Sequence, residues 1–100
     1  MLPREFETSN EKTRFILGRN QQQNDFIVRQ AKKENKNFWW FHGSITSCHA
    51  ILFTDEKKLT KNQIQEVASK IQQYSKLKNM NNGYVVYTQI KFINLQYLKF

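Results

Sequence analysis

The stretch WWFHGSITSCH, residues 39–49, places two tryptophans, a phenylalanine, two histidines and the one cysteine of the chain within eleven positions. Aromatic residues favour strands, while the glycine and serines at its centre favour a turn, so the stretch predicts an antiparallel hairpin. Side chains alternate between the two faces of a strand. We therefore expect Phe38, Trp40 and His42 on one face of the sheet and Trp39 and Phe41 on the other.

The second strand of this hairpin, CHAILF at residues 48–53, would place His49, Ile51 and Phe53 on one face and Cys48 on the opposite one. Both histidines then lie near the turn. For Trp40, packing in the core and exposure as a surface on which nucleic-acid bases stack both remain open.

Before the hairpin, the sequence predicts a strand and a helix. Residues 14–17 form a short β-like run that ends at Gly18, and residues 20–33 carry apolar side chains at helical spacing. Asn24 is a candidate N-cap for this helix.

After the hairpin, the clearest helix begins at Thr60, which forms a capping box with Gln63. Its apolar stripe recurs at intervals of three and four residues and comprises Ile64, Val67, Ala68, Ile71, Tyr74 and Leu77. One face of this helix is therefore expected to pack on the sheet. From Tyr84 the chain is strand-like, and a shift in apolar phase at Phe92 and Ile93 predicts two strands or one bulged strand.

These elements predict the α+β class: a single small domain with a mostly antiparallel sheet and two helices, in the order β-α-β-β-α-β, with or without a last strand. Residues 1–13 mix proline, polar residues and charges without periodicity. We expect them to be a flexible leader that precedes a domain over residues 14–100.

The composition favours a partner rich in negative charge. The formal net charge is +8, and the segment from Lys57 to Lys99 holds eight lysines against Glu66 alone. Such an excess suits the phosphates of a nucleic acid, and an aromatic content of 14% adds surfaces for stacking. A single cysteine, with neither a signal-peptide pattern nor a long apolar run, indicates a protein of the cytoplasm, or of the plastid stroma if it is plastid-encoded.

Two groups of residues could contact RNA on chemical grounds alone. Arg19, Asn20, Gln23 and Asn24 stand where a strand turns into a helix, and a helix N-terminus offers N–H groups to a phosphate. The same asparagines could instead cap the helix, and both roles can hold together. In the hairpin, Trp40 and His42 could present a flat face and a hydrogen-bond donor to a single strand.

A metal or nucleophile site is the competing interpretation. His42, Cys48 and His49 are the candidate residues, but Cys48 and His49 are adjacent on a strand and point to opposite faces. No second cysteine completes a tetrahedral zinc site, and the sequence shows no orienting acid for a cysteine nucleophile. A buried thiol is the expected role of Cys48.

Several short motifs follow one another in a recognisable order: GRN at 18–20, QND at 23–25, WFH at 40–42, SCH at 47–49, YSK at 74–76 and VYT at 86–88. In this order the chain resembles the NFACT-R domain, the RNA-binding module of ribosome quality-control factors and fibronectin-binding-protein-like proteins. The resemblance implies a stand-alone RNA-binding domain whose setting is tRNA or the large ribosomal subunit. The predicted RNA contacts are Arg19, Asn20, Gln23, Asn24, Trp40, His42, Ser47, His49, Lys70 and Lys76.

The chain also departs from the family pattern. Phe38 stands where the family usually carries an acidic residue, and the loop between His42 and His49 is one residue shorter than usual. The other domains of the large homologues have no counterpart, so their tailing activity is not expected here.

The sequence thus predicts a non-enzymatic RNA-binding module that needs no cofactor, metal or small-molecule substrate and does not act at a membrane. The partner is RNA, either tRNA or rRNA, and the large ribosomal subunit is a candidate assembly. The alternatives are an adapter that docks on an acidic protein and a small metal-dependent hydrolase built on histidine and cysteine.

Overall fold

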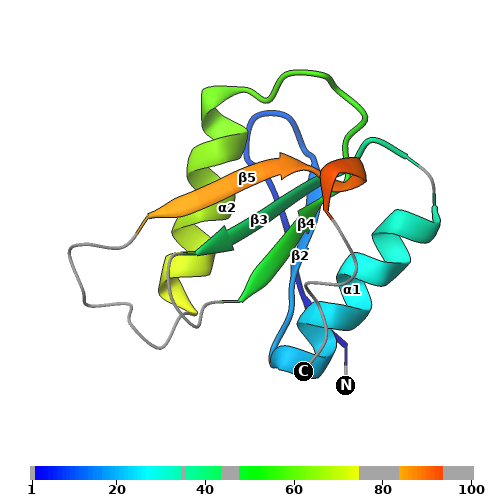
Figure 1. Cartoon of the computed structure of the whole chain (residues 1–100). Helices are drawn as coiled ribbons and strands as arrows, with labels where there is room; N and C mark the ends of the chain where they lie inside the picture. Colours follow the sequence, from blue (N-terminus) through cyan, green and yellow to red (C-terminus); the bar gives the residue numbers. More distant parts are fainter. Residues whose placement is uncertain (1, 35, 44–47, 75–83, 94–100) are drawn as a thin grey trace.

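The computed structural model describes residues 2–34, 36–43, 48–74 and 84–93. Five strands, two helices and one 3-10 turn follow one another along these segments: β1 (Arg4–Glu7), β2 (Arg14–Leu17), α1 (Gln21–Lys33), β3 (Trp39–Gly43), β4 (His49–Leu52), α2 (Lys61–Gln73), β5 (Val85–Gln89) and η1 (Ile90–Phe92). The predicted α+β class is confirmed, and Figure 1 shows the two helices on either side of one sheet.

The sheet has the strand order β1-β2-β4-β3-β5, and every neighbouring pair is antiparallel. The predicted hairpin is formed by β3 and β4, with Trp40 opposite Ile51 and His42 opposite His49. In this register the side chains alternate as expected. Phe41 packs on the α2 side of the sheet, whereas Trp40 packs on the α1 side.

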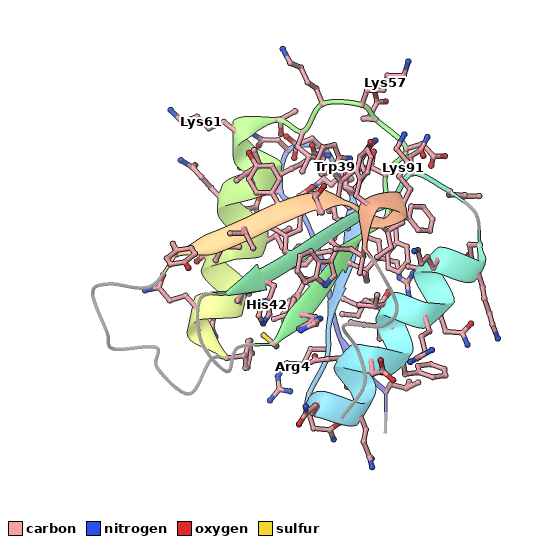
Figure 2. The ribbon with its side chains drawn as sticks, in the orientation of Figure 1. Arg4, Trp39, His42, Lys57, Lys61 and Lys91 are labelled. Carbon is pink, nitrogen blue, oxygen red and sulfur yellow. The ribbon has the colours of Figure 1, made fainter. Side chains whose placement is uncertain are left out.

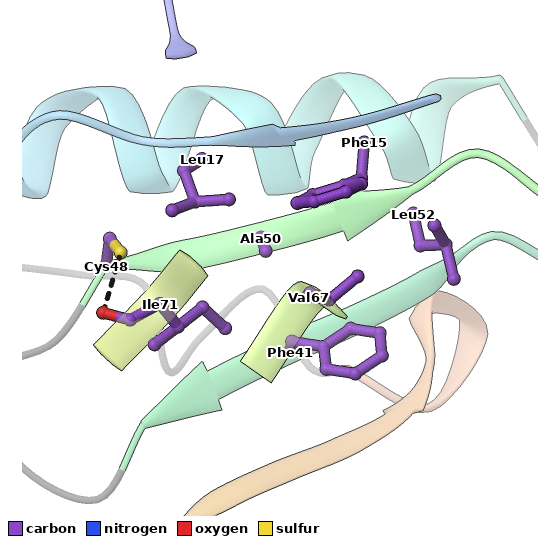
Figure 3. Close-up of a cluster of buried hydrophobic side chains, with 8 residues drawn as sticks. All are labelled: Phe15, Leu17, Phe41, Cys48, Ala50, Leu52, Val67 and Ile71. Carbon is purple, nitrogen blue, oxygen red and sulfur yellow. Dashed lines mark hydrogen bonds between the residues drawn. The ribbon is translucent and has the colours of Figure 1, made fainter. Parts of the chain in front are cut away.

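The α2 side of the sheet is closed by a tight apolar cluster (Figure 3). Its members come from β2, β3, β4 and α2 and from the residue before β4: Phe15, Leu17, Phe41, Cys48, Ala50, Leu52, Val67 and Ile71. Val67 and Ile71 lie one helical turn apart, so they present one buried face of α2 to the strands. Burial of these side chains supplies much of the free energy that holds α2 in place.

A second cluster lies between the sheet and α1. It comprises Ile16, Ile27, Val28, Ala31, Phe38, Ile51 and Ile90, with Trp40, Phe53 and Ile93 packed against it. Because β4 lies in the middle of the sheet between the two clusters, Ala50, Ile51 and Leu52 are all fully buried.

Both helices start at a side-chain cap. Thr60 and Gln63 form the predicted capping box at the start of α2. Of the two asparagines considered as caps of α1, Asn20 is the N-cap and its Oδ1 accepts the N–H of Gln23 at 2.8 Å, whereas Asn24 as N-cap is wrong. Asn24 lies within the first turns of α1 and is buried.

The expected flexible leader over residues 1–13 is replaced by ordered structure from Arg4 onward. β1 pairs along its whole length with β2, and its one apolar side chain, Phe6, contacts Phe15 with ring centroids 5.4 Å apart. After β1, Thr8 is fully buried, and the Ser9 N–H and hydroxyl both donate to Glu66 on α2, at 2.8 and 2.7 Å. These contacts make residues 4–13 part of the domain.

The last described segment also differs from the expected pair of strands or bulged strand. β5 ends at Gln89, and the chain then makes the single 3-10 turn η1. Ile90 donates its N–H to the Phe38 carbonyl at 2.7 Å and buries its side chain in the α1-side cluster, which explains the shift in apolar phase. The proposed last strand falls on residues 94–100, outside the described part of the chain.

Among the described helices, none is long and apolar enough to cross a membrane.

Candidate nucleic-acid interface

The junction between β2 and α1 meets the β3–β4 hairpin at one end of the sheet. The Gly18 N–H donates to the His49 carbonyl at 3.0 Å, and Oδ1 of Asn24 accepts the His49 N–H at 3.1 Å. A Cβ atom built on Gly18 would lie 1.9 Å from Asn24 Oδ1, so only glycine leaves room for this bond. The fold therefore brings the GRN–QND segment and the second histidine together by direct hydrogen bonds.

Trp40, His42 and His49 form a compact group, the Trp–His cluster, on the α1 side of the sheet. Trp40 Nε1–H donates to His49 Nδ1 at 3.1 Å. The ring of His42 stacks on Trp40 with centroids 5.6 Å apart, and its centroid lies 4.4 Å from that of His49. All three side chains are half-buried, so Trp40 is a supported ring within a cluster and is not a fully exposed platform.

Both histidines of this cluster favour the neutral state. Burial lowers the pKa of His42, and burial, reinforced by the neighbouring His42 and opposed by the Asp25 carboxylate, lowers the pKa of His49 to about 4. Because an indole N–H can only donate, His49 must accept at Nδ1 and carry its proton on Nε2. At neutral pH the cluster offers hydrogen bonds and ring faces, and positive charge must come from other residues.

The cluster faces a part of the sheet that α1 leaves uncovered. α1 packs on β4 and η1, and on the same face β5 sets Val86 opposite His42 and Thr88 opposite Trp40. Val86 is 45% exposed. Figure 2 shows His42 beside the ends of β3 and β4, with Lys57 and Lys91 near the opposite end of the sheet.

The side chains predicted to cradle a phosphate are mostly engaged in local structure. The Asn20 side chain caps α1, Gln23 Oε1 accepts the Arg19 N–H at 2.7 Å, and Asn24 holds His49. Arg19 itself is exposed, and its Nε donates to the Leu2 carbonyl at 2.7 Å. Arg19 is therefore the basic residue of this junction, and its side chain is bonded to the segment before β1.

Lys70 does not belong to the same region. It lies on α2, with its Nζ 4.9 Å from the centre of the Phe6 ring, on the opposite side of the sheet from the Trp–His cluster. Nearby, the Arg4 guanidinium lies 4.3 Å from the Tyr74 ring centre. The predicted contacts Ser47 and Lys76 lie outside the described residues.

In the competing metal or hydrolase interpretation, the sheet separates Cys48 from the two histidines. Cys48 is buried on the α2 side, where its Sγ contacts the Ile71 carbonyl at 3.9 Å and burial raises the pKa of the thiol to about 11. His49 points to the other face. Within the described segments, no group of three or more histidine, cysteine, aspartate or glutamate residues is placed to hold a metal ion.

A second surface feature was missed by the sequence reasoning. A groove of about 330 Å³ runs between α2 and β5, and we call it the α2–β5 groove. Its walls include Ile64, Gln65, Ser69, Gln72, Tyr84 and Tyr87. The sequence shows its parts separately, as a stripe of uncharged polar residues beside the apolar stripe of α2 and as Tyr87 of the VYT motif. Nothing in the sequence shows that these two parts face each other, because the second comes from a distant strand.

Comparisons with known proteins agree with the motif order. A family model described as the NFACT protein RNA binding domain matches residues 3–96. The solved structure of the C-terminal part of the fibronectin/fibrinogen-binding protein from Streptococcus suis is similar in fold, with a TM-score of 0.75 and 24% sequence identity over 91% of this chain. That match covers 36% of the solved chain, so the chain described here spans about a third of its neighbour. None of the curated proteins compared with the chain matches it.

Proposed function

Because the chain belongs to the NFACT RNA-binding domain family, which is a family of RNA-binding domains and not of enzymes, we propose that it binds RNA through the Trp–His cluster and the adjoining β2–α1 junction. The observation that carries this proposal is the convergence of three separate family motifs at one end of the sheet. The GRN–QND segment, the WFH strand and the residue His49 are joined there by direct hydrogen bonds.

The chemistry of this end suits a single strand or the end of a folded RNA. The stacked pair of Trp40 and His42 supplies aromatic surface. The histidines, which are neutral at pH 7, supply uncharged hydrogen-bonding groups. Exposed Arg19 adds the local charge, and the net charge of +8 supplies attraction to phosphates at longer range.

For the biological setting we propose tRNA or the large ribosomal subunit, acting in the cytoplasm or, for a plastid-encoded chain, in the stroma. The resemblance to modules of ribosome quality-control factors supports this choice. An adapter that docks on an acidic protein would also use a basic surface, so a pull-down from lysate should lose its bound material on RNase treatment if RNA is the partner.

The direct test is a titration of a fluorescently labelled single-stranded RNA of mixed sequence over a range of KCl concentrations. With about five phosphate contacts, the slope of log affinity against log salt should be roughly −3.5. His42→Ala should weaken binding while the thermal melt still shows a folded protein. A salt-independent affinity, or a His42→Ala variant that is folded and binds as wild type, would contradict the proposal.

The bound RNA itself can be identified by crosslinking the protein in its own cell and sequencing what is recovered. Enrichment of tRNA or of one region of the large-subunit rRNA would support the proposed setting. Enrichment of messenger RNA without either would contradict that setting and leave the general RNA-binding role intact.

A further inference from the structure

The α2–β5 groove has a firm aromatic wall. Tyr87 packs its ring on Phe41 with centroids 5.3 Å apart and planes 23° apart, and its centroid lies 6.0 Å from that of Trp39. In spite of this support Tyr87 is still 42% exposed, and Tyr84, the neighbouring wall residue, is 64% exposed. A flat ligand can therefore stack on these two tyrosine rings, and the ring of Tyr87 is already held in place by its packing on Phe41. Figure 1 shows β5 lying across α2 along this side of the molecule.

The opposite wall of the groove is polar and uncharged. Gln65, Ser69 and Gln72 recur at helical spacing on α2, are exposed, and make no side-chain hydrogen bond to another residue of the described segments. A glutamine side chain carries both a donor and an acceptor, which is what the edge of a nucleobase requires. These amides are thus available to a ligand with polar edges.

The charges around the groove favour a negatively charged ligand. Lys61 lies one helical turn before Gln65 on the same face of α2, and Figure 2 shows its side chain extending from the start of that helix. The nearest acidic residue of α2, Glu66, is turned away from the groove and accepts hydrogen bonds from Ser9 and Asn62. No acidic residue contributes to the walls among the described residues.

We propose that the α2–β5 groove is a pocket for one unpaired base of a single-stranded RNA, stacked on Tyr84 and Tyr87, with its edge at the glutamines and its phosphate toward Lys61. The volume of about 330 Å³ lies at the lower end of the range typical of small-ligand pockets, which suits a single base. The inference rests on the proposed RNA-binding function and adds a second site on the other side of the sheet.

Two RNA probes of equal length test the pocket. The first is an eight-nucleotide labelled single strand of mixed sequence, and the second is the same strand with abasic ribose at every position, which keeps the phosphates and removes the bases. Tyr84→Ala should weaken binding of the first probe by about 5- to 150-fold, the range for loss of one stacked base, and leave binding of the second unchanged. The matched control is Phe26→Ala, which removes an exposed ring of similar accessibility, 58%, from the outer face of α1.

The outcomes separate this inference from the proposed function. If wild type binds the first probe and Tyr84→Ala binds it no worse than Phe26→Ala does, the base pocket is wrong. If both probes lose affinity equally on Tyr84→Ala, the tyrosine acts through phosphate or through folding, which also contradicts a base pocket. If wild type binds neither probe at any salt concentration, the proposed RNA-binding function itself fails.

Gln65→Ala with Gln72→Ala provides a second, milder variant. Alanine is a good helix former at exposed positions, so α2 should remain folded. We expect a loss of affinity for the base-containing probe and an altered preference among oligo-A, oligo-C and oligo-U probes. An unchanged preference would contradict the assignment of these glutamines to the base edge.

Discussion

The Trp–His cluster and the α2–β5 groove use polar side chains in opposite ways. At the cluster, Asn24 holds His49 and Trp40 donates to the same residue, so the polar atoms are committed inside the protein. In the groove, Gln65 and Gln72 make no side-chain hydrogen bond to another described residue. The difference teaches that the motif residues of the cluster also build the fold, whereas the polar wall of the groove on α2 belongs to none of the motifs and does not stand out in the sequence.

The largest expected effect on stability is at the end of the sheet that carries the Trp–His cluster. In Gly18→Ala the new methyl group would overlap Asn24 and displace the side chain that accepts the His49 N–H. Strain plus a buried donor left unpaired should lower the free energy of unfolding by about 3 kcal/mol. Chemical denaturation measures it. Gln65→Ala in the groove is the control, expected within about 0.5 kcal/mol of wild type, and equal effects of the two changes would break the comparison.

A pH titration of stability sharpens the same contrast. His49 has a pKa of about 4 in the folded protein, below its value in an unfolded chain. Between roughly pH 6.5 and 4, His49 binds a proton in the unfolded chain but not in the folded protein. Lowering the pH over that window should therefore reduce the free energy of unfolding, by up to roughly 3 kcal/mol. Above pH 6.5 this contribution is complete. In His49→Gln, denaturation midpoints measured from pH 7 to pH 4 should fall distinctly less than those of wild type. If the two proteins show the same dependence of midpoint on pH, the loss of stability in acid comes from other titratable groups.

A matched pair of tryptophan variants compares the two faces of the hairpin directly. Both indole N–H groups have acceptors: Trp40 donates to His49 Nδ1, and Trp39 donates to the Glu56 carbonyl at 2.8 Å. Trp40→Phe leaves a half-buried nitrogen without its donor and should cost about 1 to 3 kcal/mol. Trp39→Phe frees a carbonyl of the exposed residue Glu56, which water can reach, and should cost less. Thermal melts that rank the pair in the reverse order would contradict this account of the cluster.

The smallest expected effect concerns charge alone. Arg19→Ala removes one exposed guanidinium from the β2–α1 junction and should reduce the steepness of the salt dependence of RNA binding by about 0.7 in log–log slope. The melting temperature should change little, because the bond to the Leu2 carbonyl is exposed. A slope identical to that of wild type would place the phosphates elsewhere on the basic surface.

Sequence patterns predicted those parts of the structure that depend on local periodicity. The hairpin, the alternation of Trp39 and Trp40 between the faces, and the Thr60 capping box are all as expected. β1 was missed because a four-residue strand with one apolar side chain, Phe6, has no detectable period, and its stability comes from pairing with β2. The choice of Asn20 over Asn24 as cap could not be made locally either, since it depends on the bond from His49 to Asn24.

The candidate site was predicted only in part for the same physical reason. Motif residues such as Arg19 and His42 could be proposed from their chemistry, and the fold places them at one end of the sheet. Lys70 was assigned to that site on charge alone, and the helix that carries it packs against the other face. Charge has no periodicity that reports which side of a sheet a residue will occupy.

The burial of Cys48 gives the protein an internal reporter of its own opening. With a pKa of about 11, the thiol is ionised in only about one molecule in ten thousand at pH 7, and the α2-side cluster closes over it. Iodoacetamide should therefore alkylate the chain only when α2 lifts from β4, at a rate set by the population of opened molecules. A bound RNA that spans α2 and β5 would slow this labelling, so a single natural cysteine can record where on the molecule a ligand tightens the fold.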